Sequence, residues 1–250
     1  MSRPSRIKLR HIVPSIVTAF AICAGMTSVR MSLEGDIETA LYFILIAVFL
    51  DAADGKLARF LDTASPFGAE LDTLADFFNF GIVPGILLYN TLYVGTDHAR
   101  LGFFATLVLA VCCALRLARF NLATKSTDVS LQKDGHFVGV PAPALACLAL
   151  MPIFMQLYGW ENTDLPVARA FYVIGVGLLA VSTIPTISIK HASIRRAHLP
   201  FAIVGAMVLV MSLIVYPWPT LIAGNLIYLA TLPFSYLKQQ RDQRVQAPGE

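Results

Sequence analysis

Two pairs of aspartates are the residues of this chain whose type and spacing could support chemistry. Asp51 and Asp54 are three residues apart and Asp72 and Asp76 are four apart, so on a helix each pair occupies one face. Carboxylates crowded together away from bulk water repel one another unless they are protonated or bind a cation. A ligand set made only of oxygen atoms favours a hard ion such as Mg²⁺ or Mn²⁺ over zinc. The pattern therefore predicts a divalent metal site.

The residues between the two pairs predict how the pairs meet. A short polar connection containing Ser65 and Pro66 separates them, so we expect an antiparallel helical hairpin that brings all four carboxylates to one level. Gly55, Ala58 and Gly68 leave little side-chain bulk beside the acids, which would let a ligand approach the backbone. The competing interpretation is that the acids only cap helices or pair with Lys56 and Arg59 at a membrane surface.

The composition indicates the elements that must position these acids. The chain has 250 residues, 56% hydrophobic and only 14% charged, with a mean hydropathy of +0.67, which is typical of an integral membrane protein. Long apolar runs without two-residue alternation predict an all-α bundle of about eight transmembrane helices. The expected segments are about 12–31, 37–58, 68–94, 100–119, 138–158, 167–189, 199–216 and 218–236.

The placement of basic residues predicts the orientation of this bundle. With eight spans, Arg30, Arg100 and Arg169 are the only ones of the nineteen lysines and arginines that fall on the side opposite the termini. The positive-inside rule then places both termini, and the acids, on the cytoplasmic side. The net charge of +3 is therefore explained by membrane topology, and we expect no nucleic-acid partner.

The chain is expected to form a single membrane domain over residues 1–250, with residues 51–76 as its motif core. The first apolar segment lacks a cleavage site for a signal peptidase and is long enough to span, so it is interpreted as the first helix. The four cysteines all fall in apolar segments without metal-ligand spacing and are interpreted as small buried thiols.

The stretch from Asp51 to Asp76 reads D-x2-D-G-x2-A-R-x8-G-x3-D-x3-D and resembles the signature of the CDP-alcohol phosphatidyltransferase family. Members of that family displace CMP from a CDP-alcohol with a second alcohol. The resemblance implies that the metal ligands are Asp51, Asp54, Asp72 and Asp76, and that Asp76 also acts as general base. It further implies a nucleotide site in which Gly55, Ala58 and Gly68 make room and Arg59 contacts the phosphates.

Further stretches are similar to the phosphatidylserine synthase branch of the family: PSIVT at 14–18, RLARFN at 116–121, FVGVPAPA at 137–144 and DFFNFGIVPG at 76–85. The chain departs from that branch at Ser15 and Asn79, where asparagine and serine are common. Arg116 and Arg119 share one helix face and are expected to bind a phosphate or the carboxylate of serine. The alternative is that both arginines are interfacial anchors.

The resemblance implies transfer of a phosphatidyl group from CDP-diacylglycerol to L-serine, with release of CMP, by a homodimer that contacts membrane lipids in a bacterial inner membrane. Two alternatives stay open. The same chemistry could use another acceptor, such as glycerol 3-phosphate, inositol phosphate or choline. An ion-coupled transporter could also use intramembrane acids, although the sequence has no inverted repeat and its acids lie at one interface.

Overall fold

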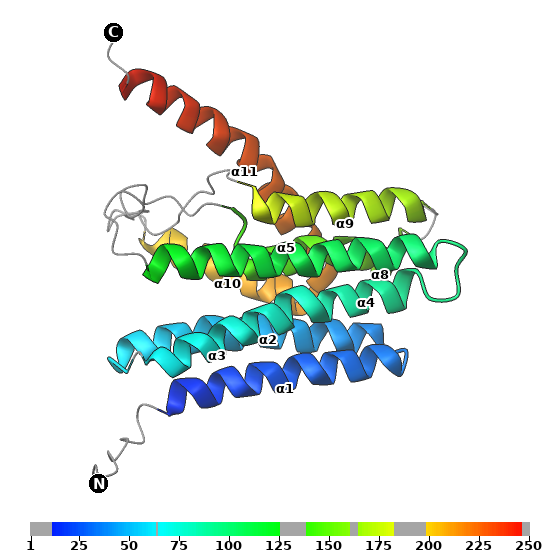
Figure 1. The fold of residues 1–250 in the computed structure, drawn as a ribbon, viewed down its shortest axis with the longest axis horizontal. Coiled ribbons are helices and arrows are strands. Elements are labelled where there is room, and N and C mark those ends of the chain that lie inside the picture. Colours follow the sequence, from blue (N-terminus) through cyan, green and yellow to red (C-terminus); the bar gives the residue numbers. More distant parts are fainter. Residues whose placement is uncertain (1–11, 64, 126–138, 161–164, 183–198, 247–250) are drawn as a thin grey trace.

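The structure, a computed structural model, describes residues 12–63, 65–125, 139–160, 165–182 and 199–246, and these form helices with no strand among them. The helices lie side by side in a bundle (Figure 1). Their bounds are α1 Val13–Leu33, α2 Ile37–Phe60, α3 Pro66–Phe77, η2 Phe78–Ile82, α4 Val83–Leu92, α5 Ala99–Lys125, α7 Ala142–Ala149, α8 Met151–Leu157, α9 Pro166–Val181, α10 Leu199–Val215 and α11 Pro217–Gln246.

Helices α1 and α2 pack along each other and are joined by a tight turn. Gly35 in that turn has a φ of +87°, a conformation that other residues rarely adopt. The Asp36 carboxylate caps α2 by accepting a hydrogen bond of 3.0 Å from the Thr39 N–H, and its interactions with Thr39 lower the pKa of Asp36. The buried Ser28 hydroxyl donates to the Ala40 carbonyl across the pair at 2.6 Å.

The helix that carries Asp72 and Asp76 departs from α geometry directly after Asp76. Residues 66–92 form one continuous helical segment, but Phe78–Ile82 make a π-helical turn, in which the Val83 N–H donates to the Phe78 carbonyl. Proline at position 84 has no N–H to donate to an α-helical hydrogen bond, and the wider turn lies immediately before it. Such π turns are frequent at functional sites.

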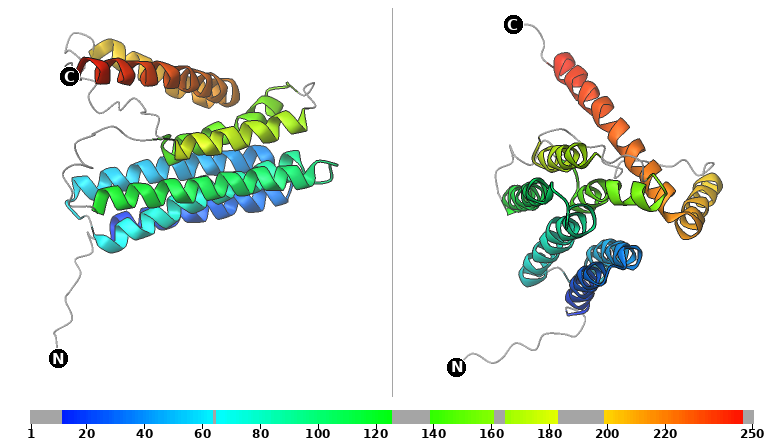
Figure 2. Two further views of the ribbon diagram at one scale, coloured as in Figure 1. Left: turned by 45° about the horizontal axis from the view of Figure 1, so that its top comes forward. Right: turned by 90° about the vertical axis from the view of Figure 1, so that its right-hand side faces the viewer.

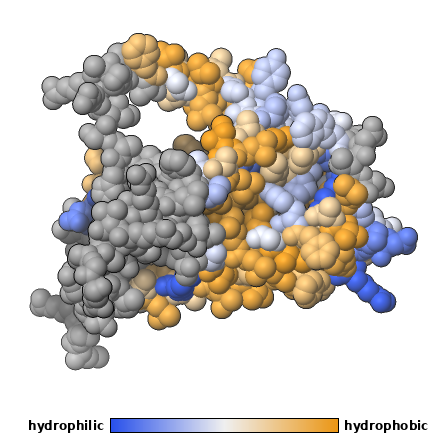
Figure 3. Space-filling model, turned by 90° about the horizontal axis from the view of Figure 1, so that it is seen from above, coloured by the Kyte–Doolittle hydropathy of each residue, from blue (hydrophilic) through white to orange (hydrophobic). Residues whose placement is uncertain are grey.

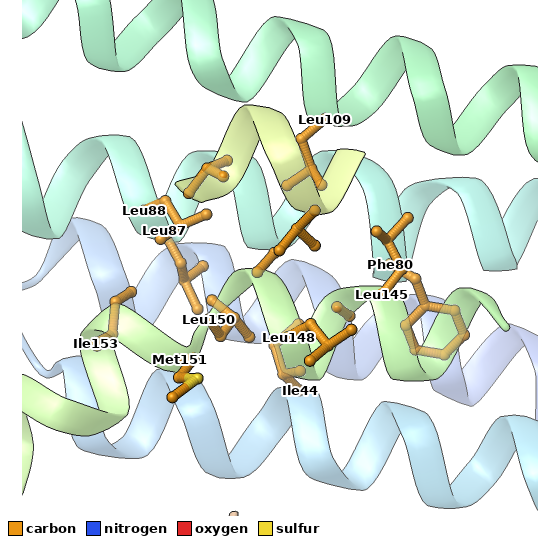
Figure 4. Packing of buried hydrophobic residues seen from close by; sticks show 14 of the residues in the cluster. Ile44, Phe80, Leu87, Leu88, Leu109, Leu145, Leu148, Leu150, Met151 and Ile153 are labelled. Carbon is orange, nitrogen blue, oxygen red and sulfur yellow. The ribbon is translucent and has the colours of Figure 1, made fainter. Parts of the chain in front are cut away.

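The hydrophobic core lies where α4, α5, α7, α8 and α9 meet. Leu87 and Leu88 of α4 lie close to Leu150 and Ile153, and Phe80 lies near Leu145 of α7 (Figure 4). Each of these side chains is at most 1% exposed. The two views of Figure 2 show α10 and α11 paired with each other at the edge of the bundle, where Trp218 of α11 stacks on Phe154 of α8.

The all-helical architecture of the described residues confirms the predicted all-α class and is consistent with a membrane protein. Within the described part of the chain, three helical stretches are long and apolar enough to cross a bilayer, namely Val13–Leu33, Pro66–Leu92 and Ala99–Ala123. Pro166–Val181 and Ile203–Val215 are shorter apolar helices. Much of the surface seen in Figure 3 is hydrophobic. The count of eight spans and the cytoplasmic position of both termini stay predictions.

The described helices follow the predicted segments with four main differences, the first of which is that α5 continues past residue 119, to Lys125. The fifth predicted segment is divided at Leu150 into α7 and α8, and Pro152 lies in the first turn of α8, where a proline is tolerated. Helix α9 ends at Val181, and residues 183–189 of the predicted sixth segment lie outside the described residues. Helix α11 continues beyond the predicted end, to Gln246.

Candidate metal and substrate site

Three of the four aspartates come together where α2 ends and α3 begins. Asp51, Asp54 and Asp72 each offer a carboxylate oxygen, and these oxygens all lie within 4.8 Å of one another. Helix α1 packs against both α2 and α3, and α2 and α3 approach each other less closely than either approaches α1. The acids therefore face each other across a gap with α1 at its side.

Thr18 of α1 fixes the orientation of one of these acids. Asp54 is only 4% exposed, and its Oδ2 accepts a hydrogen bond of 2.6 Å from the Thr18 hydroxyl, itself 4% exposed. The Thr18 hydroxyl also lies 3.1 Å from the Pro14 carbonyl, but its single proton serves the nearer, charged oxygen better. Thr18 belongs to the PSIVT stretch. The sequence identified this stretch as a motif but did not predict its contact with Asp54.

Asp76 lies directly beside the three-aspartate cluster. Its carboxyl group lies close to that of Asp51, and it interacts electrostatically with Arg116 of α5. Among the described residues, Oδ1 of Asp76 is buried without a hydrogen-bond partner. An acceptor oxygen in that position is available to a proton, a cation or a substrate hydroxyl.

These residues fit a divalent metal ion. The donor atoms are all carboxylate oxygens, the set that hard divalent cations prefer. Crowded carboxylates at the edge of a hydrophobic bundle also need compensating positive charge. The cluster of Asp51, Asp54 and Asp72 can therefore hold a metal ion, with Asp76 next to it.

A cavity of about 150 Å³ opens beside the acids. Its lining includes two of the aspartates and the three small residues that the sequence assigned to a nucleotide site; in full the lining is Pro14, Ser15, Thr18, Asp54, Gly55, Ala58, Thr63, Ser65, Gly68, Ala69 and Asp72. No atom would lie within 4 Å of a Cβ added to Gly55. This open space next to the backbone is what a bulky ligand requires.

The walls of the cavity also carry polar groups. Ser65 caps α3 by accepting a hydrogen bond of 3.0 Å from the Gly68 N–H. Thr63 is 3% exposed, and its hydroxyl has no hydrogen-bond partner among the described residues. Arg59 is exposed, and its Nε donates to the Gly55 carbonyl at 2.9 Å, so its guanidinium lies next to the cavity without being part of the lining.

The two arginines of the RLARFN stretch have different interaction partners. Arg116 interacts electrostatically with Asp76, and its Nε is buried without a hydrogen-bond partner among the described residues. Arg119 instead donates to the carbonyls of Val181 at 2.8 Å and Ser182 at 3.2 Å, at the end of α9. Arg116 therefore interacts with an acid of the site, whereas Arg119 donates hydrogen bonds to carbonyl groups at the end of α9.

Among the other predicted motif residues, Asn121 contacts the helix that carries Asp72. Asn121, at the end of RLARFN, donates to the Thr73 hydroxyl at 3.1 Å, next to Asp72. Asn79 is 1% exposed, and neither polar atom of its side chain has a partner among the described residues. Of the FVGVPAPA stretch, Phe137 and Val138 lie outside the described residues.

The fold and site describe a helical protein with long apolar helices and a cluster of aspartates that could hold a metal ion. The chain belongs to the CDP-alcohol phosphatidyltransferase family, whose model matches residues 11–237. Among characterised relatives, the chain is similar to the CDP-diacylglycerol–serine O-phosphatidyltransferases of Mycobacterium leprae and Mycobacterium tuberculosis. It is 33% identical to the first over 234 residues (92% of this chain and 76% of that protein) and 34% identical to the second over 237 residues (92% and 80%). The Helicobacter pylori enzyme of the same name is 31% identical over 175 residues, which cover 70% of this chain and 71% of that protein.

Proposed function

We propose that this protein transfers the phosphatidyl group of CDP-diacylglycerol to L-serine and releases CMP. The observation that carries this proposal is the position of Asp76, which lies beside the cluster of Asp51, Asp54 and Asp72. Two members of that cluster, Asp54 and Asp72, line an open cavity. The names of the similar mycobacterial and Helicobacter enzymes support serine as the acceptor. The reaction is a transferase step in phospholipid synthesis at the membrane.

In this proposal the acids bind the metal ion, and the residues around the cavity bind the nucleotide. Asp51, Asp54 and Asp72, with a contribution from Asp76, hold a divalent ion, Mg²⁺ or Mn²⁺. When bound, that ion neutralises the diphosphate and stabilises CMP as the leaving group. Gly55, Ala58 and Gly68 leave space for the cytidine nucleotide, and Arg59, at the cavity edge, pairs with its phosphates.

The chemical step follows from the position of Asp76. Its carboxylate accepts the proton of the serine hydroxyl while the hydroxyl oxygen attacks the lipid-side phosphorus in line. A new phosphorus–oxygen bond forms to serine, and the bond between that phosphorus and the bridging oxygen breaks. CMP departs with the bond electrons, and phosphatidylserine is the second product. Arg116, next to Asp76, binds the carboxylate of serine.

The orientation and assembly of the protein form part of the proposal. The distribution of basic residues supports an active site at the cytoplasmic face of a bacterial inner membrane, with both termini on that side. The apolar surface of the bundle supports contact with membrane lipids. A homodimer is proposed from the family resemblance, and chemical cross-linking in native membranes tests it.

The acceptor is tested by CMP release from purified protein in detergent, given CDP-diacylglycerol with Mn²⁺ or Mg²⁺. We expect release with L-serine, and little release with glycerol 3-phosphate, inositol phosphate or choline. Efficient release with one of the other alcohols would leave the proposed metal site in place but would show that serine is not the acceptor. Release that persists in excess EDTA would contradict the metal-dependent mechanism.

A further inference from the structure

The hydroxyl of Tyr228, on α11, is a polar group near the site that no motif includes. The ring of Tyr228 packs against the hydrophobic core. Its Oη is buried without a hydrogen-bond partner among the described residues. A buried hydroxyl that makes no hydrogen bond destabilises a fold, so this group is expected to gain a partner in the working enzyme.

Arg116 links this hydroxyl to Asp76. The guanidinium of Arg116 interacts electrostatically both with Asp76 of α3 and with Tyr228 of α11. Arg116 Nε and Asp76 Oδ1 are also buried without a hydrogen-bond partner among the described residues. Three helices that are distant in sequence therefore contribute one unsatisfied polar atom each to the same region.

The chemistry of these three atoms describes the ligand that would satisfy them. Arg116 Nε–H and the Tyr228 O–H are donors, and a carboxylate can accept from both. Asp76 Oδ1 is an acceptor, and an aliphatic hydroxyl can donate to it. The complementary ligand is a small molecule with a carboxylate at one end and a hydroxyl at the other, a description that fits the proposed acceptor serine.

We propose that Tyr228, together with Arg116, binds the α-carboxylate of the amino-acid acceptor and thereby selects a carboxylate-bearing alcohol. This inference rests on the proposed function, because it presupposes a hydroxyl acceptor at Asp76. It adds a specificity-determining residue from α11, a helix that lies far in sequence from the motif that holds the metal ligands.

The test compares Tyr228→Phe, which removes only the hydroxyl, with the wild-type enzyme in detergent with CDP-diacylglycerol and Mn²⁺. Tyr89→Phe is the matched control, because Tyr89 of α4 is a half-buried tyrosine packed edge-on against Phe103 and outside the site. We expect the KM for serine to rise about tenfold or more in Tyr228→Phe, the loss of one hydrogen bond to a charged group. The KM for CDP-diacylglycerol and the Mn²⁺ dependence should not change, and Tyr89→Phe should resemble the wild type.

A second acceptor separates binding of the carboxylate from a general structural effect. L-Serine methyl ester keeps the hydroxyl but has no carboxylate charge, so Tyr228→Phe should impair the reaction of the ester far less than that of serine. If the variant and the wild type have the same KM for serine, or if both acceptors are impaired equally, the inference about Tyr228 is overturned.

The wild-type enzyme alone provides a further test that no folding defect can obscure. It should use serine with a KM at least tenfold below that of the methyl ester, and equal values would overturn the inference while leaving serine transfer intact. If the wild type releases CMP only with an alcohol other than serine, the proposed function fails first. The two failures are therefore distinguishable.

Discussion

The Thr18 hydroxyl donates a 2.6 Å hydrogen bond to Oδ2 of Asp54, and both side chains are buried. A hydrogen bond of this kind fixes which carboxylate oxygen faces the neighbouring acids. Partners that orient metal ligands commonly account for a 10–100-fold change in metal affinity. Helix α1, which carries no acid at the site, thus helps to orient the cluster of aspartates.

The variant Thr18→Val replaces the hydroxyl with a methyl group of similar size and should weaken Mn²⁺ binding about 10–100-fold. Thr18→Ser keeps the hydroxyl and is the matched control, with an expected change of less than about threefold. Titration of Mn²⁺ into purified protein, followed by electron paramagnetic resonance, measures the affinity independently of turnover. Equal affinities in Thr18→Val and Thr18→Ser would show that the contact does not position Asp54.

Asp72→Asn should abolish Mn²⁺ binding at the cluster, because it removes one of three carboxylates whose oxygens lie within 4.8 Å. Asp97→Asn is the control, since Asp97 is an exposed acid between α4 and α5. In the wild type, excess EDTA should remove both the bound Mn²⁺ and the CMP release, and added Mn²⁺ should restore them. Unchanged Mn²⁺ binding in Asp72→Asn would place the metal elsewhere.

Gly55→Leu should block the cavity without unfolding the helix, because nothing lies within 4 Å of a Cβ at this position. The KM for CDP-diacylglycerol should rise ~10-fold or more, as a filled binding space loses on the order of 1–3 kcal/mol. Gly175→Leu on α9 is the matched control, since Gly175 is an exposed helical glycine that also has open space around it. A KM that is the same in both variants would argue against a nucleotide beside Gly55.

Arg119→Ala tests whether this arginine supports the fold or binds substrate. Because its guanidinium donates to two carbonyls at the end of α9, its loss should lower the free energy of unfolding by about 2 kcal/mol. The KM for serine should change little, and the exposed Arg100→Ala should alter neither quantity. A large increase in the KM for serine without loss of stability would instead support the substrate role that the sequence suggested.

The sequence predicted those features that depend on local spacing. The three- and four-residue intervals of the aspartates and the nearby small residues anticipated the cluster of Asp51, Asp54 and Asp72 and the open space at Gly55. The apolar segments anticipated the helices closely, and the resemblance anticipated the family. These features are local because a helix fixes the relative positions of residues one turn apart.

The features that the sequence did not reveal depend on packing between distant helices. The Thr18–Asp54 hydrogen bond, the proximity of Tyr228 to Arg116 and the attachment of Arg119 to α9 each join elements far apart in the chain. Helical periodicity does not determine which faces of different helices meet. The π turn after Asp76 is likewise absent from the sequence predictions, because apolar periodicity does not distinguish α from π geometry over a single turn.

The most direct test of the central claim is the incorporation of radiolabelled L-serine into lipid by the purified protein, supplied with CDP-diacylglycerol and Mn²⁺. The wild type should form labelled phosphatidylserine and an equal amount of CMP. Asp76→Asn should form neither, yet still bind CDP-diacylglycerol in the presence of the metal. Labelled lipid formed at near wild-type rates by Asp76→Asn, or no labelled lipid from the wild type, would contradict the account.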